Sequence, residues 1–188
     1  LPSLIVSPTT LLYNWQAEIA RFAPTLSVAL ITGSRALRGK ALKAALEEGA
    51  DVLITTYPLL RQDIALYRDV RFRFAALDEA QNIKNFTSQT ARTAKRIDAH
   101  TRLALTGTPM ENNVTELWSL FDFVMPGYLH SAREFIRRYE DGRRAEELRL
   151  RIRPFLMRRL KADVMSELPD KLSTTMYCEM GAEQRRVY

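Results

Sequence analysis

The sequence contains few residues of the kinds that bind metals or form disulfides. Its single cysteine, Cys178, excludes an intrachain disulfide, and two distant histidines, His100 and His130, cannot complete a standard zinc site with it. No apolar run approaches the roughly 18 residues that a membrane-spanning helix requires. No charged segment followed by an apolar stretch opens the chain, as it would in a secretory signal. These absences favour an intracellular protein that does not contact a membrane.

A loop that could cradle nucleotide phosphates is also missing. Such a loop reads G-x-x-x-x-G-K followed by Ser or Thr, because its backbone N–H groups surround the phosphates and its hydroxyl reaches Mg²⁺. The nearest match, GSRALRGK at residues 33–40, has five residues between its glycines, and Ala41 follows the lysine. We interpret it as a surface turn before a basic helix. Because the chain starts without methionine inside the run LPSLIVSP, we expect a longer protein that carries the phosphate loop upstream.

The composition is that of a globular protein with a modest excess of positive charge. The chain has 188 residues, 46% of them hydrophobic, which is enough for a sizeable core. Lys and Arg number 28 against 22 Asp and Glu, a net charge of +6. This balance suits a polyanionic partner such as nucleic acid, but it is also common in proteins that bind none.

The hydrophobic pattern alternates between strands and helices, which predicts an α/β fold. Apolar runs of strand length, rich in β-branched and aromatic residues, occupy residues 3–7, 27–32, 51–56, 71–77 and 101–106. Apolar residues at helical spacing, such as Leu12, Trp15 and Ile19, lie between them. This βαβ alternation predicts a parallel sheet covered by helices. Several runs are so uniformly apolar that we expect those strands to be buried on both faces.

After the fifth run the alternation stops. Val114, Leu117, Trp118 and Phe121 predict one more core helix, with Asn113 as its N-cap. Pro126-Gly127 then breaks the chain, and an arginine-rich helical stretch continues to Lys161. The predicted organisation is a lobe at 1–126, a helical protrusion and return segment at 127–172, and the start of a connection to a further lobe at 173–188.

Four polar motifs follow predicted strands: SPTT, TTYP, DEAQ and TGTP. Ligands of parallel sheets bind at the carboxyl ends of the strands, so these motifs are expected at one rim. Within DEAQ, the adjacent carboxylates Asp78 and Glu79 suit phosphoryl transfer, in which one acid holds Mg²⁺ and a neighbour positions the attacking water. Each motif is weak alone, and their common placement strengthens the hypothesis.

The motifs belong to longer stretches of the chain, which read LIVSPTTLLYNWQAEIARFAP, DVLITTYPLLRQD, LDEAQNIKN, RLALTGTPMENNVTELWSLFDFVMPG, FLMRRLKADVMSELPDK and EMGAEQRRVY. In this order they resemble the Swi/Snf-type ATPases of helicase superfamily 2. The resemblance implies a double-stranded DNA translocase with two RecA-like lobes and ATP in the cleft between them. This chain then corresponds to the first lobe, without its first strand and phosphate loop, and the second lobe is an expected partner.

The resemblance assigns roles to residues of two motifs. Asp78 would coordinate Mg²⁺, and Glu79 would orient or deprotonate the attacking water. Gln81 stands where a histidine is commonest in the family; its amide can hydrogen-bond toward the γ-phosphate or the TGTP loop but cannot titrate. The loop that senses the nucleotide state corresponds to Thr106, Gly107, Thr108 and Pro109.

The resemblance also suggests DNA-contacting residues. The SPTT and TTYP loops would hold the DNA backbone, whose phosphates carry no sequence information. The candidates there are Ser7, Thr9, Thr55 and Thr56, although such hydroxyls also commonly cap helices. Further candidates are Arg158, Arg159 and Lys161 of the basic stretch, which could line DNA or pack against the other lobe, and Lys171 of the later LPDK motif. A solvated helical face is the simpler interpretation of that stretch, because acids interrupt its basic residues.

These features lead to one main hypothesis and two alternatives. The main hypothesis is an ATP- and Mg²⁺-dependent translocase on double-stranded DNA that displaces or remodels DNA-bound proteins, with this chain alone expected to be inactive as an ATPase. The alternatives are a nucleotide-independent DNA-binding or protein-docking module and a strand-separating helicase. The alanine- and arginine-rich composition suggests a bacterial, nucleoid-associated protein; a eukaryotic one would be nuclear.

Overall fold

The computed structural model describes residues 1–107, 114–159 and 186. The described residues form two compact units, and the boundary between the units lies between Ala145 and Glu146. The predicted boundary at residue 126 therefore falls inside the first unit, because α6, Ala132–Tyr139, belongs to that unit and buries Phe135 and Tyr139. The boundary predicted at residue 172 lies outside the described residues. No described helix has both the length and the apolar character needed to span a bilayer.

The first unit is built on one parallel five-stranded sheet in the order β2-β3-β1-β4-β5, as the βαβ pattern predicts. The strands are β1 Ser3–Ser7, β2 Val28–Leu30, β3 Val52–Thr56, β4 Arg71–Leu77 and β5 Asp98–Ala104. The fifth strand thus begins three residues before its predicted start at 101 and ends before Thr106. Consequently Thr106 lies in the loop beyond the strand, where it can reach other loops.

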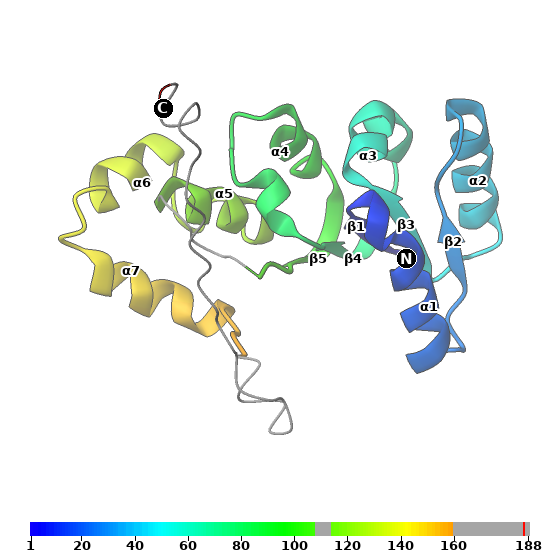
Figure 1. Cartoon of the computed structure of the whole chain (residues 1–188), viewed down its shortest axis with the longest axis horizontal. Coiled ribbons are helices and arrows are strands. Elements are labelled where there is room, and N and C mark those ends of the chain that lie inside the picture. The colour runs from blue at the N-terminus through cyan, green and yellow to red at the C-terminus, as the bar shows by residue number, and fades with distance from the viewer. Residues whose placement is uncertain (108–113, 160–185, 187–188) are drawn as a thin grey trace. The chain divides into compact units, whose positions relative to one another are not determined.

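Helices of various lengths connect the strands (Figure 1). The α-helices of the first unit are α1 Leu12–Phe22, α2 Arg35–Glu47, α3 Tyr57–Asp63, α4 Gln89–Ala94, α5 Val114–Val124 and α6 Ala132–Tyr139. The 3-10 helices are η1 Thr9–Leu11, η2 Ile64–Tyr67 and η3 Ala80–Ile83. The second unit contains nearly all of α7, Ala145–Ile152, and η4, Arg153–Phe155. The Asn113 cap expected for α5 lies outside the described residues.

Two cores cover the two faces of the sheet. The larger core joins the strands to α2, α3, α4 and α5, with Leu120 and Phe123 of α5 buried as the helical spacing predicts. The smaller core lies under α1, where Leu12 packs with Ile5 and Ile54, and Trp15 is partly buried against them. Helices thus lie on both faces, and α1 is the one described helix that covers the second face.

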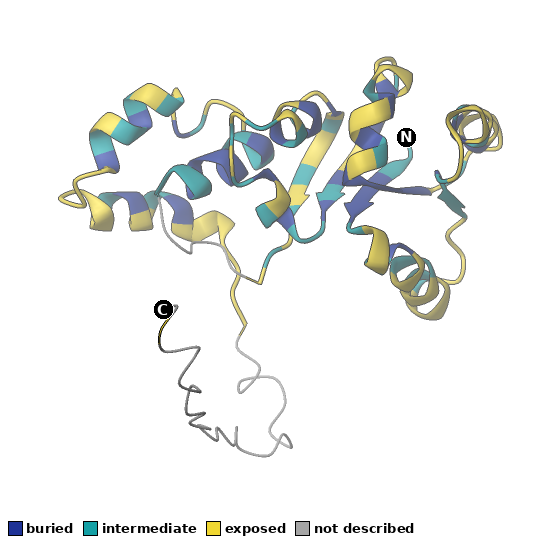
Figure 2. Cartoon of the chain, turned by 45° about the horizontal axis from the view of Figure 1, so that its top comes forward, coloured by how far each residue is buried: buried dark blue, intermediate teal, exposed yellow. Residues whose placement is uncertain are grey.

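The uncovered part of that second face lies on β4 and β5. Phe74 is paired with Thr101, and Leu103 follows two residues later on the same side of β5. Phe74 is 41% exposed, Leu103 47% and Leu105 43%, and Figure 2 shows exposed residues along these strands. The expectation that several strands are buried on both faces holds for β1 and β3. β4 and β5 are exposed on one face, because no described helix covers them there.

A buried ion pair joins α2 to α3. The Arg38 guanidinium donates hydrogen bonds from Nε and Nη2 to the two carboxylate oxygens of Asp63, and both side chains are almost fully buried. Arg38 also donates to the Gly33 carbonyl and to the Gln62 amide oxygen. The hydrogen bond that Arg38 donates to Asp63 raises the pKa of Arg38 above its ordinary value. This network fixes the helix that follows β3.

Removing one partner of this pair should destabilise the chain strongly. We expect Asp63→Asn to lower the free energy of unfolding by about 3–5 kcal/mol, because it leaves the Arg38 charge buried and uncompensated. The double variant Arg38→Met/Asp63→Leu should cost less, since it removes both charges. Urea unfolding followed by circular dichroism measures these differences.

The exposed pair Lys43–Glu47 provides the control. Lys43→Met should cost only about 0.5 kcal/mol or less, as is usual for an exposed i,i+4 pair. If Asp63→Asn cost no more than this control, the buried pair would not hold α2 and α3 together.

Candidate functional site

Asp78 and Glu79 lie at the carboxyl rim of the sheet, immediately after β4. Leu77 is level with Val6 of β1 on one side and with Ala104 of β5 on the other. The Asp78 N–H donates to the Val6 carbonyl at 2.8 Å, which extends the ladder by one residue beyond β4. The carboxylate pair therefore emerges between two other strand ends, the position at which parallel sheets bind ligands.

Asp78 is held by neutral donors rather than by a cation. Its Oδ1 accepts the Glu79 N–H at 2.9 Å, and its Oδ2 accepts the Trp15 Nε1–H at 2.8 Å. Asp78 is half-buried, and neither it nor Glu79 makes an ion pair with any described residue. Each Asp78 oxygen keeps a further lone pair, so the carboxylate can still accept a cation.

This donor set fits Mg²⁺ bound with a nucleotide. Mg²⁺ usually takes one or two carboxylates and completes its shell with water and substrate phosphates. Asp78 supplies one such oxygen ligand, and Glu79 follows it directly. The described residues include no group of three His, Cys, Asp or Glu side chains that could hold a metal, so they form no complete protein cage.

The backbone of Glu79 adopts a left-handed conformation, with φ 50° and ψ 53°. Non-glycine residues pay of order 1–3 kcal/mol for such geometry, and it persists where the surroundings enforce it, often at functional sites. Here the Glu79 carbonyl accepts hydrogen bonds from the backbone N–H of Asn82 at 3.0 Å and from its side-chain amide at 2.8 Å. The turn that carries the second carboxylate is thus fixed by its own loop.

Gln81 connects the predicted catalytic loop, DEAQ, to the loop predicted to sense the nucleotide state, TGTP. Its Nε2 donates to Glu79 Oε2 at 2.6 Å, and its Oε1 accepts from Thr106 Oγ1 at 2.9 Å. Of the two directions expected for this amide, the structure shows the one toward the TGTP loop. Gly107 is exposed beside Thr106, whereas Thr108 and Pro109 lie outside the described residues.

Two residues of the site were not predicted from the sequence, Trp15 and Tyr57. Tyr57 begins α3, and its hydroxyl donates to the Asp78 carbonyl at 2.7 Å. Burial raises the pKa of Tyr57, and the nearby carboxylates Asp78 and Glu79 add to the effect, so the hydroxyl stays protonated. The only sequence signal for either residue was that a buried tyrosine or tryptophan needs a polar partner.

The four predicted DNA-contacting hydroxyls differ in their exposure. Ser7, Thr55 and Thr56 are at most 2% exposed, and the Thr55 hydroxyl donates to the Ile31 carbonyl at 3.2 Å. Ser7 Oγ donates to the Pro8 carbonyl at 3.3 Å. All three side chains are buried in this structure, and their proposed contact with the DNA backbone stays a prediction. Thr9, in η1, is exposed.

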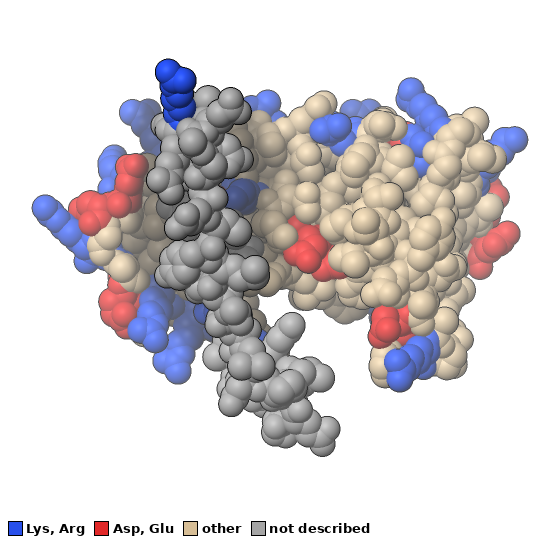
Figure 3. Space-filling view, viewed as in Figure 1, with Lys and Arg blue, Asp and Glu red and all other residues tan. Residues whose placement is uncertain are grey.

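The basic candidates near the end of the chain are only partly described. Arg158 and Arg159 are exposed and belong to the second unit, while Lys161 and Lys171 lie outside the described residues. On the face shown in Figure 3, the Lys and Arg side chains over α1, α2 and α3 lie mainly at the margins. The structure thus shows no continuous basic track across these helices on that face.

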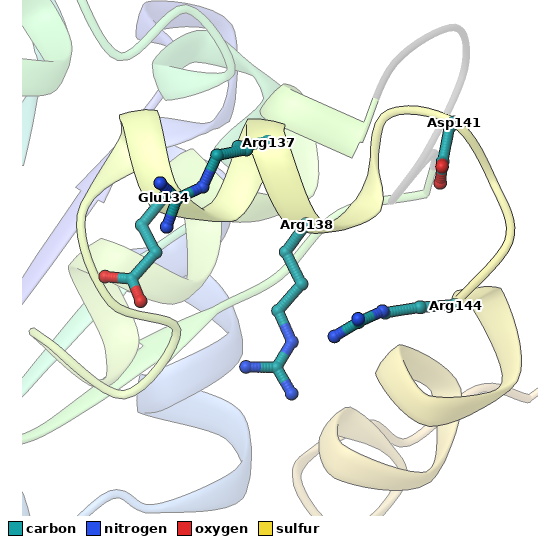
Figure 4. A pocket seen from close by; sticks show the side chains of 5 residues that line it. All are labelled: Glu134, Arg137, Arg138, Asp141 and Arg144. Carbon is teal, nitrogen blue, oxygen red and sulfur yellow. The ribbon is translucent and has the colours of Figure 1, made fainter.

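A hollow of about 360 Å³ lies at the carboxyl end of α6 (Figure 4). Its lining consists of Glu134, Arg137, Arg138, Asp141 and Arg144. The lining thus carries two negative and three positive charges. Arg137 and Arg138 occupy the last turn of α6, where cations offset the helix dipole. We interpret this hollow as a feature of the helix end and not as the catalytic site.

Comparisons with known proteins identify the family of the chain. The chain matches the model of the SNF2-related domain over residues 2–188. It is 44% identical to the putative ATP-dependent helicase/translocase YwqA of Bacillus subtilis and 40% identical to the TATA-binding protein-associated factor MOT1 of Saccharomyces cerevisiae. Both alignments cover 100% of this chain, but only 21% and 11% of those proteins.

Solved structures give the same result for the fold. The SWI2/SNF2 ATPase core of Sulfolobus solfataricus in complex with double-stranded DNA superposes with a TM-score of 0.77 at 38% identity. The match covers 99% of this chain and 40% of that one. It confirms the predicted RecA-like α/β sheet. On the strength of the domain match and of these relatives, the chain belongs to the SNF2-related family.

Proposed function

We propose that this chain forms the first RecA-like lobe of a motor that hydrolyses ATP to move along double-stranded DNA. The observation that carries the proposal is the carboxylate pair at the sheet rim. Asp78 and Glu79 stand free of ion pairs with described residues, and Gln81 links Glu79 to Thr106 of the next loop. This arrangement supports a phosphoryl-transfer site that communicates with a neighbouring loop.

The residues of the rim divide the chemistry between them. Asp78 holds Mg²⁺, which when bound neutralises charge on the nucleotide phosphates. Glu79 orients the attacking water or accepts its proton. Gln81 keeps the Glu79 carboxylate in place and connects it to Thr106 through a second hydrogen bond. The phosphate cradle and a second lobe would come from other parts of the whole protein, and the uncovered face of β4 and β5 leaves room for such a segment beside the rim.

Sequence-independent contact with the DNA backbone is the second part of the proposal. Thr9 is exposed in the turn between β1 and α1, where a hydroxyl and backbone N–H groups suit a phosphate oxygen. The similarity to a core solved with double-stranded DNA supports a duplex as the track. Displacement of DNA-bound proteins and a bacterial, nucleoid-associated location are further parts of this proposal.

Translocation and strand separation remain distinguishable, since the names of relatives include both helicase and translocase. A translocase displaces a third strand from a triplex without opening the underlying duplex. Parallel triplex-displacement and strand-displacement assays of the full-length protein separate the two activities, and we expect only the first.

Removal of either rim carboxylate should stop the chemistry. In the full-length protein, we expect Asp78→Asn or Glu79→Gln to lower DNA-stimulated ATP hydrolysis by about 10²–10⁴-fold, the usual contribution of a positioned acid or base. Phosphate release measures turnover, and fluorescence anisotropy with labelled duplex, measured without metal and nucleotide, should show unchanged DNA binding. Turnover close to that of the wild type would remove both residues from the mechanism.

The link through Gln81 should affect coupling more than hydrolysis. Gln81→Ala breaks both hydrogen bonds, to Glu79 and to Thr106, while leaving both carboxylates in place. We expect the ratio of DNA-stimulated to basal ATP hydrolysis to fall several-fold, with basal hydrolysis changed less. An equal loss in both rates would instead indicate a purely catalytic role.

Thr9 should contribute to DNA binding without regard to sequence. Thr9→Ala removes one hydroxyl that can donate to a phosphate. We expect DNA affinity to fall by up to about tenfold, which corresponds to a net hydrogen bond of about 1.4 kcal/mol. Anisotropy titrations on several duplex sequences should show the same loss for each. The matched control is Thr25→Ala, an exposed threonine between α1 and β2, at the opposite rim. A loss confined to particular sequences would contradict backbone recognition.

A further inference from the structure

The side chain of Trp15 reaches across the fold to Asp78. Trp15 lies in the first turn of α1, and its Nε1–H donates to Asp78 Oδ2 at 2.8 Å although 63 positions separate the two residues. The indole offers a single donor and no acceptor. Its ring is only partly buried against the core under α1, so packing alone does not account for where the N–H points.

The second tryptophan provides a comparison within the same unit. Trp118 of α5 is buried, and its Nε1–H donates to the backbone carbonyl of His130 at 3.1 Å. That arrangement is an ordinary way to satisfy an indole in a core. Trp15 instead donates to the carboxylate that is the proposed metal ligand. Donors to ligating carboxylates fix their orientation and tune the metal site.

Asp78 is also tied to α3. Tyr57, the first residue of α3, donates from its hydroxyl to the Asp78 carbonyl at 2.7 Å. Thr9, the proposed phosphate contact, lies in η1 directly before α1, and Tyr57 directly follows the TT of the TTYP motif. Asp78 is therefore hydrogen-bonded at its carboxylate to α1, which follows the SPTT segment, and at its backbone carbonyl to Tyr57 of the TTYP motif.

We propose that Trp15 is a positioning residue that orients the Asp78 carboxylate toward the metal–nucleotide and connects it to the β1–α1 segment. This inference rests on the proposed function, because it takes Asp78 as the metal ligand. A shift of α1 when the segment engages DNA moves the indole N–H relative to Asp78 Oδ2. The metal affinity then changes with DNA binding, and the coupling is reciprocal.

The test measures metal binding without turnover. Mn²⁺ serves as the paramagnetic probe in place of Mg²⁺, with ADP present, and electron paramagnetic resonance gives its affinity for the full-length protein. We expect Trp15→Phe to weaken Mn²⁺ binding about 10–100-fold, the usual cost of losing a partner of a metal ligand. Saturating duplex should change the Mn²⁺ affinity of the wild type and change that of Trp15→Phe less.

Two controls separate this role from a structural one. Trp118→Phe removes the other indole N–H and should leave Mn²⁺ affinity within about twofold of the wild type, because its acceptor is a backbone carbonyl away from Asp78. Replacing Trp15 by 3-benzothienylalanine keeps the bicyclic shape and deletes only the N–H. The analogue should weaken Mn²⁺ binding as much as Trp15→Phe does. It also provides the test if the phenylalanine variant folds poorly.

The outcomes distinguish this inference from the proposed function. Wild-type Mn²⁺ affinity in the benzothienyl variant, together with lost binding in Asp78→Asn, would overturn the role of Trp15 and leave Asp78 as the ligand. Wild-type affinity in Asp78→Asn would overturn the metal assignment itself. An unchanged response to duplex in a variant with weakened binding would overturn the connection to the β1–α1 segment.

Discussion

Val6, Leu77 and Ala104 stand level in the parallel ladder of β1, β4 and β5, and this alignment determines where the chemistry of the chain can occur. A parallel ladder leaves all its carboxyl ends at one rim, so residues distant in sequence emerge there side by side. Asp78 and Thr106 meet through Glu79 and Gln81 for this reason. A shift of one residue in register would reverse the faces of every side chain on the strand.

Two carboxylates of the first unit, Asp63 and Asp78, show how the same group can serve opposite purposes. Asp63 is buried against Arg38, and the pair neutralises itself, so it can hold helices together but cannot attract a cation. Asp78 is held by the neutral donors Trp15 and Glu79 N–H, which orient the carboxylate without cancelling its charge. Because no described residue compensates the charge of Asp78, the rim is suited to bind a metal ion together with a nucleotide.

The sequence sufficed for features that depend on local pattern and on chain order. It placed β1, β3 and β4 and put Asp78 at a strand end, since apolar runs and polar motifs are local signals. It did not show that Thr55 is buried and hydrogen-bonded inside the fold. The acceptor of its hydroxyl is the Ile31 carbonyl, which lies 24 residues earlier, just after β2. Nor did it identify Trp15, whose helical spacing with Leu12 indicated only a core position and whose acceptor lies in another motif. Hydrogen-bond partners from different strands and helices are set by tertiary packing, and the periodicity of the sequence carries no information about them.

The convergence on Asp78 also limits how the site can respond to its surroundings. Its N–H, its carbonyl and both carboxylate oxygens are each engaged, by Val6, Tyr57, Glu79 and Trp15. A residue fixed at four points cannot adjust independently, so movement of α1 or α3 must either carry Asp78 along or break a hydrogen bond. Packed interfaces change between discrete arrangements rather than deforming gradually. The site is therefore restricted to few states, and the proposed motor function would require this property.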